Sequence, residues 1–315
     1  MLSMKTVGLL VGRERTFPDA LIDAVTRRDP GVTAAYAKID LTRVDEPPPY
    51  DVLVDRISHE ITCYQPVLKL AALAGTRVVN NPFWRIADDK AFGTALAKRL
   101  GVPVPKTWVL PSKSYGEDID AGSLHNLRFP LDWEGMAREA GFPMYLKPHW
   151  GGGFRDVYRV ESLDELWRAF DRTGRLTMIA QEGIEWTTYV RCVVIGKTDV
   201  LVLRWDPRLP HGERYVRAKE TMPALSPELE ATITEHAITL CQALGYDMNT
   251  VEFAIRDGVP YAIDFMNSAP DFEGKFLPPD VFAWIVDKMA ALCVRLANGE
   301  ARVTYRWVAL LAGAR

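Results

Sequence analysis

The chain has 315 residues, a formal net charge of −3 and a hydrophobic fraction of 48%, all ordinary for a globular protein. Its length predicts two or three lobes with a large buried core. The acidic balance leaves no basic face for nucleic acid, and no apolar run is long enough to span a membrane. The four cysteines lack metal-ligand spacing, which favours reduced thiols and a soluble cytoplasmic protein.

Strands and helices alternate in the first part of the chain. Buried strands are expected at 6–11, 32–39 and 51–56, separated by helical segments. Alternation of this kind predicts a parallel sheet flanked by helices. We assign this unit to residues 1–86.

A second unit, residues 87–184, is expected to contain both helices and strands. Its first helix ends at Gly101, and strands are predicted at 106–110 and 143–148. The polar stretch 111–130 between these strands is either an insertion or a lid.

The third unit, residues 185–315, is rich in predicted strands. Strands at 189–195 and 200–205 precede a long helix that begins at Ser226 and ends at Gly245. An Asp-Gly turn joins the two strands that follow, and a helix ends the chain. The fold class is therefore α/β, built partly from α+β lobes.

Two carboxylates and an amide interrupt the last two predicted strands. Glu252 lies in T-V-E-F-A-I, and Asp264 and Asn267 lie in Y-A-I-D-F-M-N. An ionised group inside an apolar strand is costly unless it is paired. Gathered carboxylate and amide oxygens are ligands for a Mg²⁺ ion that also holds phosphates. A solvent-facing alternation of polar positions explains these residues equally well from the two strands alone.

A lysine and a glycine run follow the strand at 143–148. Lys147 ends this strand, and Gly151, Gly152 and Gly153 come soon after it. Close backbone approach and an ammonium group suit a phosphate, whereas a flexible turn with a surface lysine is the alternative. The positive charge of Lys90 is unfavourable at the N-terminus of the helix that it begins, so a bound phosphate would explain why a lysine stands there. An exposed lysine beside acidic residues is the simpler interpretation.

Two arginines lie on neighbouring strands that are otherwise apolar. Arg191 and Arg204 are either edge residues with stems along an apolar surface or clamps for phosphate or carboxylate, and their positions favour the clamp. A linker that leaves the preceding strand suits an adenine edge; it consists of Gln181, Glu182, Gly183 and Ile184.

Taken in order, these segments resemble the ATP-grasp superfamily, specifically the RimK-type and glutathione-synthase-like carboxylate–amine ligases. The matching segments are D-V-L-V-D-R-I at 51–57, D-K at 89–90 with G-V-P-V-P-K-T at 101–107, Y-L-K-P at 145–148, Q-E-G-I at 181–184, Y-V-R-C-V-V-I-G at 189–196 and N-S-A-P at 267–270. The resemblance covers most of the chain. It implies an ATP-grasp fold preceded by an N-terminal parallel α/β pre-ATP-grasp domain.

The resemblance also implies roles for the residues singled out above. The two lysines would hold the α- and β-phosphates of ATP, the glycines would cover them, and the linker would bind adenine. The acids and the amide would bind Mg²⁺, with Mn²⁺ as a substitute. The two arginines would steady the transferring phosphoryl group.

Two features depart from the family pattern. Two residues instead of one separate Asp264 from Asn267, and a β-bulge would accommodate the additional residue. The loop after Lys147 carries three consecutive glycines and a tryptophan in place of the commoner serine–glycine arrangement.

The implied function is ATP-dependent amide or peptide bond formation through an acyl phosphate. The implied partners are a small-molecule or peptide carboxylate and an amine, and a homodimer is the assembly that the family suggests. Arg13, Arg56 and Arg217 suggest an anionic substrate, with ordinary surface arginines equally consistent. The alternatives are an ATP-grasp small-molecule kinase and a nucleotide-binding regulatory module without turnover.

Overall fold

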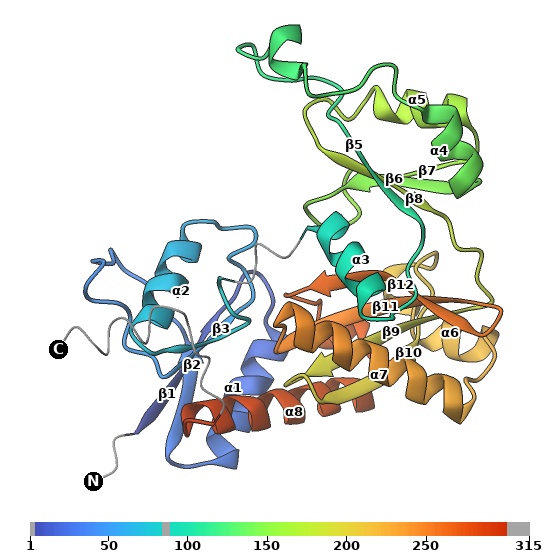
Figure 1. Ribbon diagram of the computed structural model, residues 1–315. Helices are drawn as coiled ribbons and strands as arrows, with labels where there is room; N and C mark the ends of the chain where they lie inside the picture. Colours follow the sequence, from blue (N-terminus) through green and yellow to red (C-terminus); the bar gives the residue numbers. More distant parts are fainter. Residues whose placement is uncertain (1–3, 84–88, 301–315) are drawn as a thin grey trace.

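The computed structural model describes residues 4–83 and 89–300, which form three four-stranded sheets with their helices (Figure 1). None of the described helices is both long enough and apolar enough to cross a membrane.

The N-terminal sheet is parallel throughout, as the alternation of strands and helices predicts. Its strands lie in the order β2-β1-β3-β4, namely β1 (Lys5–Leu10), β2 (Val32–Tyr36), β3 (Val52–Asp55) and β4 (Arg77–Val79). Helix α1 (Thr16–Arg28) follows β1, and α2 (Tyr64–Leu73) follows β3.

The central lobe is an antiparallel sheet in the order β5-β8-β6-β7. Its strands are β5 (Thr107–Leu110), β6 (Met144–Pro148), β7 (Tyr158–Val160) and β8 (Met178–Glu182), and its helices are α4 (Trp133–Ala140) and α5 (Leu163–Phe170). Ser162 caps α5 by accepting a hydrogen bond from the N–H of Glu165. The polar stretch 111–130 reaches away from this lobe and forms a short 3₁₀ turn at Ala121–Leu124 (Figure 1).

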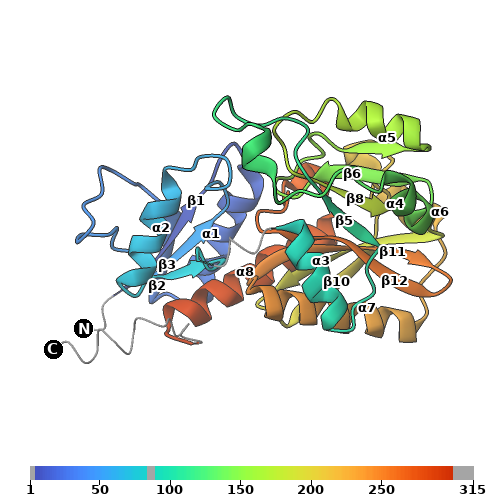
Figure 2. The same cartoon turned by 45° about the horizontal axis from the view of Figure 1, so that its top comes forward.

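The C-terminal lobe is an antiparallel sheet in the order β10-β9-β11-β12. Its elements are β9 (Thr188–Ile195), β10 (Asp199–Arg204), α6 (Val216–Thr221), α7 (Pro227–Leu244), β11 (Met248–Arg256), β12 (Val259–Asn267) and α8 (Pro279–Ala297). Ser226 caps α7, and Gly245 ends it in the left-handed conformation with φ of 78°. Figure 2 shows the central lobe beside this sheet.

Helix α3 (Lys90–Arg99) packs on the C-terminal lobe, although the division at residue 87 groups it with the central lobe. Ala97 joins the apolar cluster that α7 forms with the C-terminal sheet. A Cβ atom on Gly93 would lie only 2.8 Å from Sδ of Met266 on β12. A larger residue at this position would therefore have to displace the side chain of Met266.

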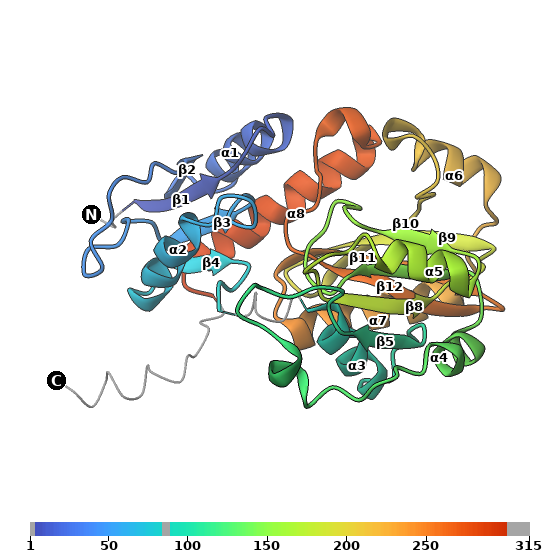
Figure 3. The ribbon, with the colours of Figure 1, turned by 90° about the horizontal axis from the view of Figure 1, so that it is seen from above.

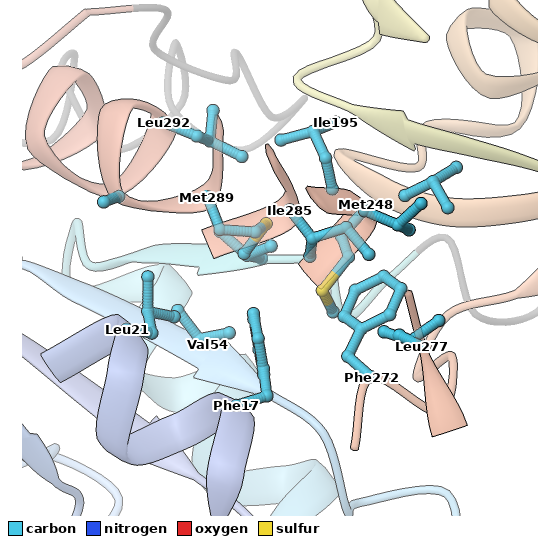
Figure 4. Close-up of a cluster of buried hydrophobic side chains, with 14 of the residues drawn as sticks. Phe17, Leu21, Val54, Ile195, Met248, Phe272, Leu277, Ile285, Met289 and Leu292 are labelled. Carbon is cyan, nitrogen blue, oxygen red and sulfur yellow. The ribbon is translucent and has the colours of Figure 1, made fainter. Parts of the chain in front are cut away.

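The two faces of the C-terminal sheet have different partners. Val190, Cys192 and Phe253 point to one face and pack with α7. The opposite face carries Val193 and Met248, which join a core cluster shared with α8, α1 and the N-terminal sheet (Figure 4). Because α8 runs between the C-terminal lobe and the N-terminal sheet, one apolar core joins these two units (Figure 3).

A buried ion cluster also joins the N-terminal domain to the C-terminal lobe. Arg77 on β4 donates two hydrogen bonds to Asp247, at 3.0 and 2.9 Å. Lys197 is 2.9 Å from the same carboxylate, whose residue is only 4% exposed. A charge buried to this extent is stable only while its partners remain.

We expect Arg77→Met to lower the free energy of unfolding by about 2 kcal/mol, because it removes one of the two cations that pair with the buried Asp247 among the described residues. Urea denaturation measures this loss. The matched control is Arg43→Met, which removes an exposed arginine paired with Asp45 and should change stability by less than about 0.5 kcal/mol. Equal losses in the two variants would show that the buried cluster does not hold the two units together.

Candidate functional site

Three charged residues form a row across the C-terminal sheet, on the face opposite α7. Arg191 on β9 pairs with Glu252 on β11, and Glu252 pairs with Asp264 on β12. Side chains of paired residues on neighbouring strands point to the same side of a sheet. The register therefore places one guanidinium group and two carboxylates side by side.

Both oxygens of Glu252 have neighbours from β9. The hydroxyl of Tyr189 donates to Oε2 at 2.8 Å, and Nε of Arg191 is 3.5 Å from Oε1. Burial raises the pKa of Glu252 to about 7; Arg191 opposes this shift and Asp264 adds to it. The positive charge around Glu252 is thus too small to offset the cost of burying its ionised carboxylate.

The central lobe brings a lysine to the same place. Lys147, at the end of β6, is 8% exposed, and its Nζ donates to the carbonyl of Ile263 on β12 at 3.3 Å. Burial lowers its pKa to about 8, while Asp264 and Glu252 raise it and Lys90 lowers it. The charge of this ammonium group is therefore affected by both acids and by Lys90.

Arg191 carries a buried donor that no described residue accepts. Its Nη2 donates to Oγ1 of Thr250 at 3.2 Å, and its guanidinium carbon is 5.1 Å from the centre of the Trp205 ring. Its Nε has no hydrogen-bond acceptor among the described residues, because the contact with Glu252 has ion-pair distance but not hydrogen-bond geometry. Burial lowers the pKa of Arg191, but Tyr215 and Glu252 outweigh it and the pKa is raised.

Lys90 lies where α3 begins, against the loop that follows β6. Asp89 caps the helix by accepting hydrogen bonds from the N–H groups of Ala91 and Phe92. The other acid next to Lys90 in the sequence, Asp88, lies outside the described residues. The backbone N–H of Lys90 donates to the carbonyl of His149 at 2.9 Å, and its Nζ donates to the carbonyl of Gly151. Lys90, one of the two lysines that the resemblance assigns to ATP, thus contacts the glycine loop directly.

The glycine loop uses backbone conformations that favour glycine. Gly151 and Gly153 have φ of 110° and 71°, and no atom lies within 4 Å of a Cβ built on Gly151 or Gly152. The loop is exposed and projects its backbone into open space. Such a loop can approach a bound group without steric obstruction.

Of the residues predicted to form the adenine linker, Gln181 and Glu182 end strand β8, and Gly183 and Ile184 follow it. Nε2 of Gln181 donates to Oγ1 of Thr107, and Glu182 forms an ion pair with Arg256 at 2.9 Å. The N–H of Gly183 donates to the carbonyl of Pro143, and a Cβ on Gly183 would lie 2.5 Å from that oxygen, so only glycine fits. Ile184 is buried in the core cluster.

The structure does not bring Arg204 to the row of charges. Arg204 pairs with Val190, whose side chain packs toward α7, so strand alternation places Arg204 on the opposite face of the sheet. Its guanidinium donates to the carbonyl of Met222 at 2.7 Å. The position of Arg204 therefore does not support the clamp that its apolar surroundings favour.

The three arginines suggested for an anionic substrate lie in different surroundings. Arg56 is buried, and its three nitrogens contact the carboxylate of Glu14, the carbonyl of Pro270 and the sulfur of Met248. Arg13 is exposed, and Arg217 pairs with a glutamate one helical turn away. Arg56 thus joins the N-terminal domain to the loop after β12 and has no nitrogen left without a protein contact.

Asn267 reaches the same face as the two acids through a β-bulge. Glu252 pairs with Asp264, but Thr250 pairs with Asn267, so two steps along β11 match three along β12. The structure confirms the bulge that the additional residue requires. Nδ2 of Asn267 donates to Oγ1 of Thr250 at 3.0 Å, which leaves its Oδ1 as an acceptor.

Sequence reasoning missed Tyr189, Thr250 and Trp205 as parts of the site. The available signal was strand alternation, because Tyr189 stands two positions before Arg191 and Thr250 two before Glu252. Tyr189 also begins the segment Y-V-R-C-V-V-I-G, and its phenol contacts Glu252.

The residues present suit a hard divalent cation. Glu252, Asp264 and Asn267 share one face, and the raised pKa of Glu252 reflects burial that its positive neighbours do not offset. The described residues contain no cluster of three or more histidine, cysteine or acidic side chains. Two acids and an amide fit Mg²⁺ or Mn²⁺ that takes its other oxygens from water and phosphate.

No family model matches the chain. The D-alanine–D-alanine ligase of Ralstonia nicotianae is 25% identical over 242 residues, which are 68% of this chain and 72% of that ligase. The mitochondrial pyruvate carboxylase of Homo sapiens is 27% identical over 193 residues, which are 57% of this chain. The match spans only 15% of the length of that carboxylase.

Solved structures match almost the whole chain. A RimK-domain ATP-grasp protein from Sphaerobacter thermophilus has a TM-score of 0.64 at 20% identity, over 93% of this chain and 100% of that one. A D-alanine–D-alanine ligase from Bacillus anthracis complexed with ATP has a TM-score of 0.63 at 14% identity, over 95% and 100%. The ATP-grasp ligase PsnB, complexed with a minimal precursor, Mg and ADP, has a TM-score of 0.61 at 15% identity, over 94% and 97%. The chain therefore has the fold of the ATP-grasp superfamily.

Proposed function

We propose that the protein is an ATP-dependent carboxylate–amine ligase that forms an amide or peptide bond through an acyl phosphate with Mg²⁺. The observation that carries the proposal is the contact of Lys147 with the carbonyl of Ile263, which brings the ammonium group next to Asp264 and into the electric field of both acids. Buried groups of opposite charge from two lobes gain from a ligand that is itself both anionic and cation-binding. A Mg²⁺-bound triphosphate has this combination.

Lys147 would neutralise phosphate charge from the side of the central lobe. Among the described residues its ammonium group has one hydrogen-bond acceptor, the carbonyl of Ile263, so it has donors left for phosphate oxygens. Lys90 would exchange its contact with the carbonyl of Gly151 for a phosphate oxygen. The exposed glycine loop would then close over the nucleotide and exclude water.

Arg191 would stabilise the group that is transferred. Its buried Nε has no acceptor in the described part of the chain, and an unsatisfied buried donor costs about 1–3 kcal/mol, which an anionic oxygen would relieve. Glu252, Asp264 and Asn267 would hold the metal, which when bound neutralises charge on the outer phosphates. Both effects act on charge that develops during phosphoryl transfer, so no protein nucleophile is required.

The relatives support a carboxylate and an amine as substrates. D-alanine–D-alanine ligases are named for joining two amino acids, and PsnB is an ATP-grasp ligase complexed with a precursor peptide. A small-molecule or peptide carboxylate with an amine partner is the substrate class that we assign to this chain. Incubation with Mg·ATP and pairs of carboxylates and amines tests the assignment through ADP release.

We expect Lys147→Ala to weaken ATP binding by about 100-fold, because charged hydrogen bonds to phosphate contribute about 1.5–3 kcal/mol. The shift of the melting temperature by Mg·ATP measures this loss. The matched control is Lys113→Ala, which removes an exposed lysine of the same lobe paired with Asp171 and should leave the shift unchanged. Full Mg·ATP stabilisation of Lys147→Ala would refute the nucleotide site.

ATP affinity should depend on pH through Lys147. Its pKa of about 8 means that the ammonium form dominates below pH 8 and is lost above it. Phosphate binds the ammonium form, so affinity should be constant at lower pH and fall by up to about tenfold per pH unit above pH 8. Calorimetry from pH 7 to 9.5 measures the profile, and Lys147→Arg should flatten it. A profile that is identical in Lys147→Arg would assign the titration to another group.

Glu252→Gln and Asp264→Asn should each abolish Mg²⁺-dependent turnover and keep the fold, because they remove the charge but not the shape of the side chain. Circular dichroism checks the fold, and ADP release with carboxylate and amine substrates measures turnover. Amine-dependent ADP release in the native protein is the result that a ligase predicts. Release with an acceptor but without any amine would identify a kinase, and nucleotide binding without release would identify a regulatory module.

A further inference from the structure

One buried side chain spans the additional residue of β12. Oδ1 of Asn249 accepts the backbone N–H of Asn267 at 2.9 Å, and its Nδ2 donates to the backbone carbonyl of Phe265 at 2.8 Å. These two backbone groups flank Met266, so one amide bonds the chain on both sides of the bulge. Asn249 is 0% exposed and faces α7, from which Sγ of Cys241 is 3.4 Å from its Nδ2.

The next residue of β11 acts on the opposite face. Oγ1 of Thr250 accepts Nδ2 of Asn267 at 3.0 Å and Nη2 of Arg191 at 3.2 Å. Thr250 is 2% exposed, so water does not compete for these bonds. Its hydroxyl fixes which end of the Asn267 amide points back into the protein, and the oxygen end is turned outward.

This arrangement solves a problem that the spacing creates. Asp264 and Asn267 are three residues apart, and in a regular strand they would point to opposite faces. The bulge rotates Asn267 to the face of the acids, but a bulge disrupts the ladder and leaves backbone groups unpaired. Asn249 supplies the missing partners of the backbone groups, and Thr250 supplies an acceptor for the side-chain amide of Asn267.

We infer that Asn249 and Thr250 are positioning residues for the metal site: Asn249 holds the backbone of Asn267, and Thr250 orients its amide. The inference rests on the proposed function, since it takes Asn267 to be a metal ligand. Partners that orient metal ligands typically contribute 10–100-fold to metal affinity. Asn249 and Thr250 thus place Asn267 on the face of Asp264, although the two residues are three positions apart and a spacing of two positions is usual.

The test compares metal binding in variants of Thr250 and Asn267. Mn²⁺ is titrated into the ADP-bound protein, and the half-saturating concentration is read from the melting temperature. Thr250→Val removes the acceptor and keeps the shape, and we expect it to raise this concentration about tenfold or more. ADP affinity without metal should not change. Thr250→Ser keeps the hydroxyl and should restore native Mn²⁺ binding.

A double variant separates the action on Asn267 from the contact with Arg191. If Thr250 acts through Asn267, Asn267→Ala raises the Mn²⁺ concentration as Thr250→Val does, and the double variant shows no further rise. Additive shifts would overturn the inference, as would native Mn²⁺ binding in Thr250→Val. Thr188→Val is the matched control, a buried threonine on β9 that pairs with Ile255 on the opposite face and should bind Mn²⁺ normally.

Asn249→Leu extends the test to the backbone contact. It should lower the melting temperature and, in protein that remains folded, raise the Mn²⁺ concentration by a similar factor. If Asn267→Ala binds Mn²⁺ normally while Glu252→Gln does not, the positioning inference falls and the metal site stands. If Glu252→Gln also binds Mn²⁺ normally, the proposed function itself fails at this site.

Discussion

The burial of opposite charges between two lobes is the constraint on which the arrangement of this protein depends. Lys147 extends from the central sheet and contacts β12 of the C-terminal sheet. On that sheet Glu252 pairs with Asp264 on one side and with Arg191 on the other. Burial pushes the pKa values of Lys147 and Glu252 in opposite directions, to about 8 and about 7, so each is close to losing its charge. A site in this condition gains most from a ligand that brings both negative oxygens and a cation.

The other contacts of the molecule keep this meeting point in place. Gly183 allows the chain that leaves β8 to pass against the carbonyl of Pro143, and the pairing of Glu182 with Arg256 joins the end of β8 to β11 of the C-terminal sheet. Helix α3 lies on the C-terminal lobe, yet its first residue touches the glycine loop of the central lobe. On the other side, α8 and the pairing of Arg77 with Asp247 attach the N-terminal domain to the same sheet. The charges thus lie on a rigid sheet beneath a lobe with an exposed loop.

Much of the architecture was predictable because it depends on local patterns. Alternating strands and helices predicted the parallel sheet, and Ser226 and Gly245 marked helix ends that the structure confirms. The helix at 133–140 and the short strand at 158–160 were not predicted, because their apolar residues form no clear period alone. Arg204 shows the same limit within the site, since an apolar strand does not reveal which face a given residue occupies.

By itself, the sequence determined the order of the elements, the identity of the two acids and two lysines, and the need for a bulge before Asn267. These follow from residue type and spacing, which are properties of the chain. Only the tertiary structure decided that Lys147 contacts β12 next to Asp264, that Tyr189 and Thr250 contact Glu252 and Asn267, and that Arg56 is already held by Glu14. Those outcomes depend on strand register and on the packing of one element against another, which bring together residues that are distant in the sequence.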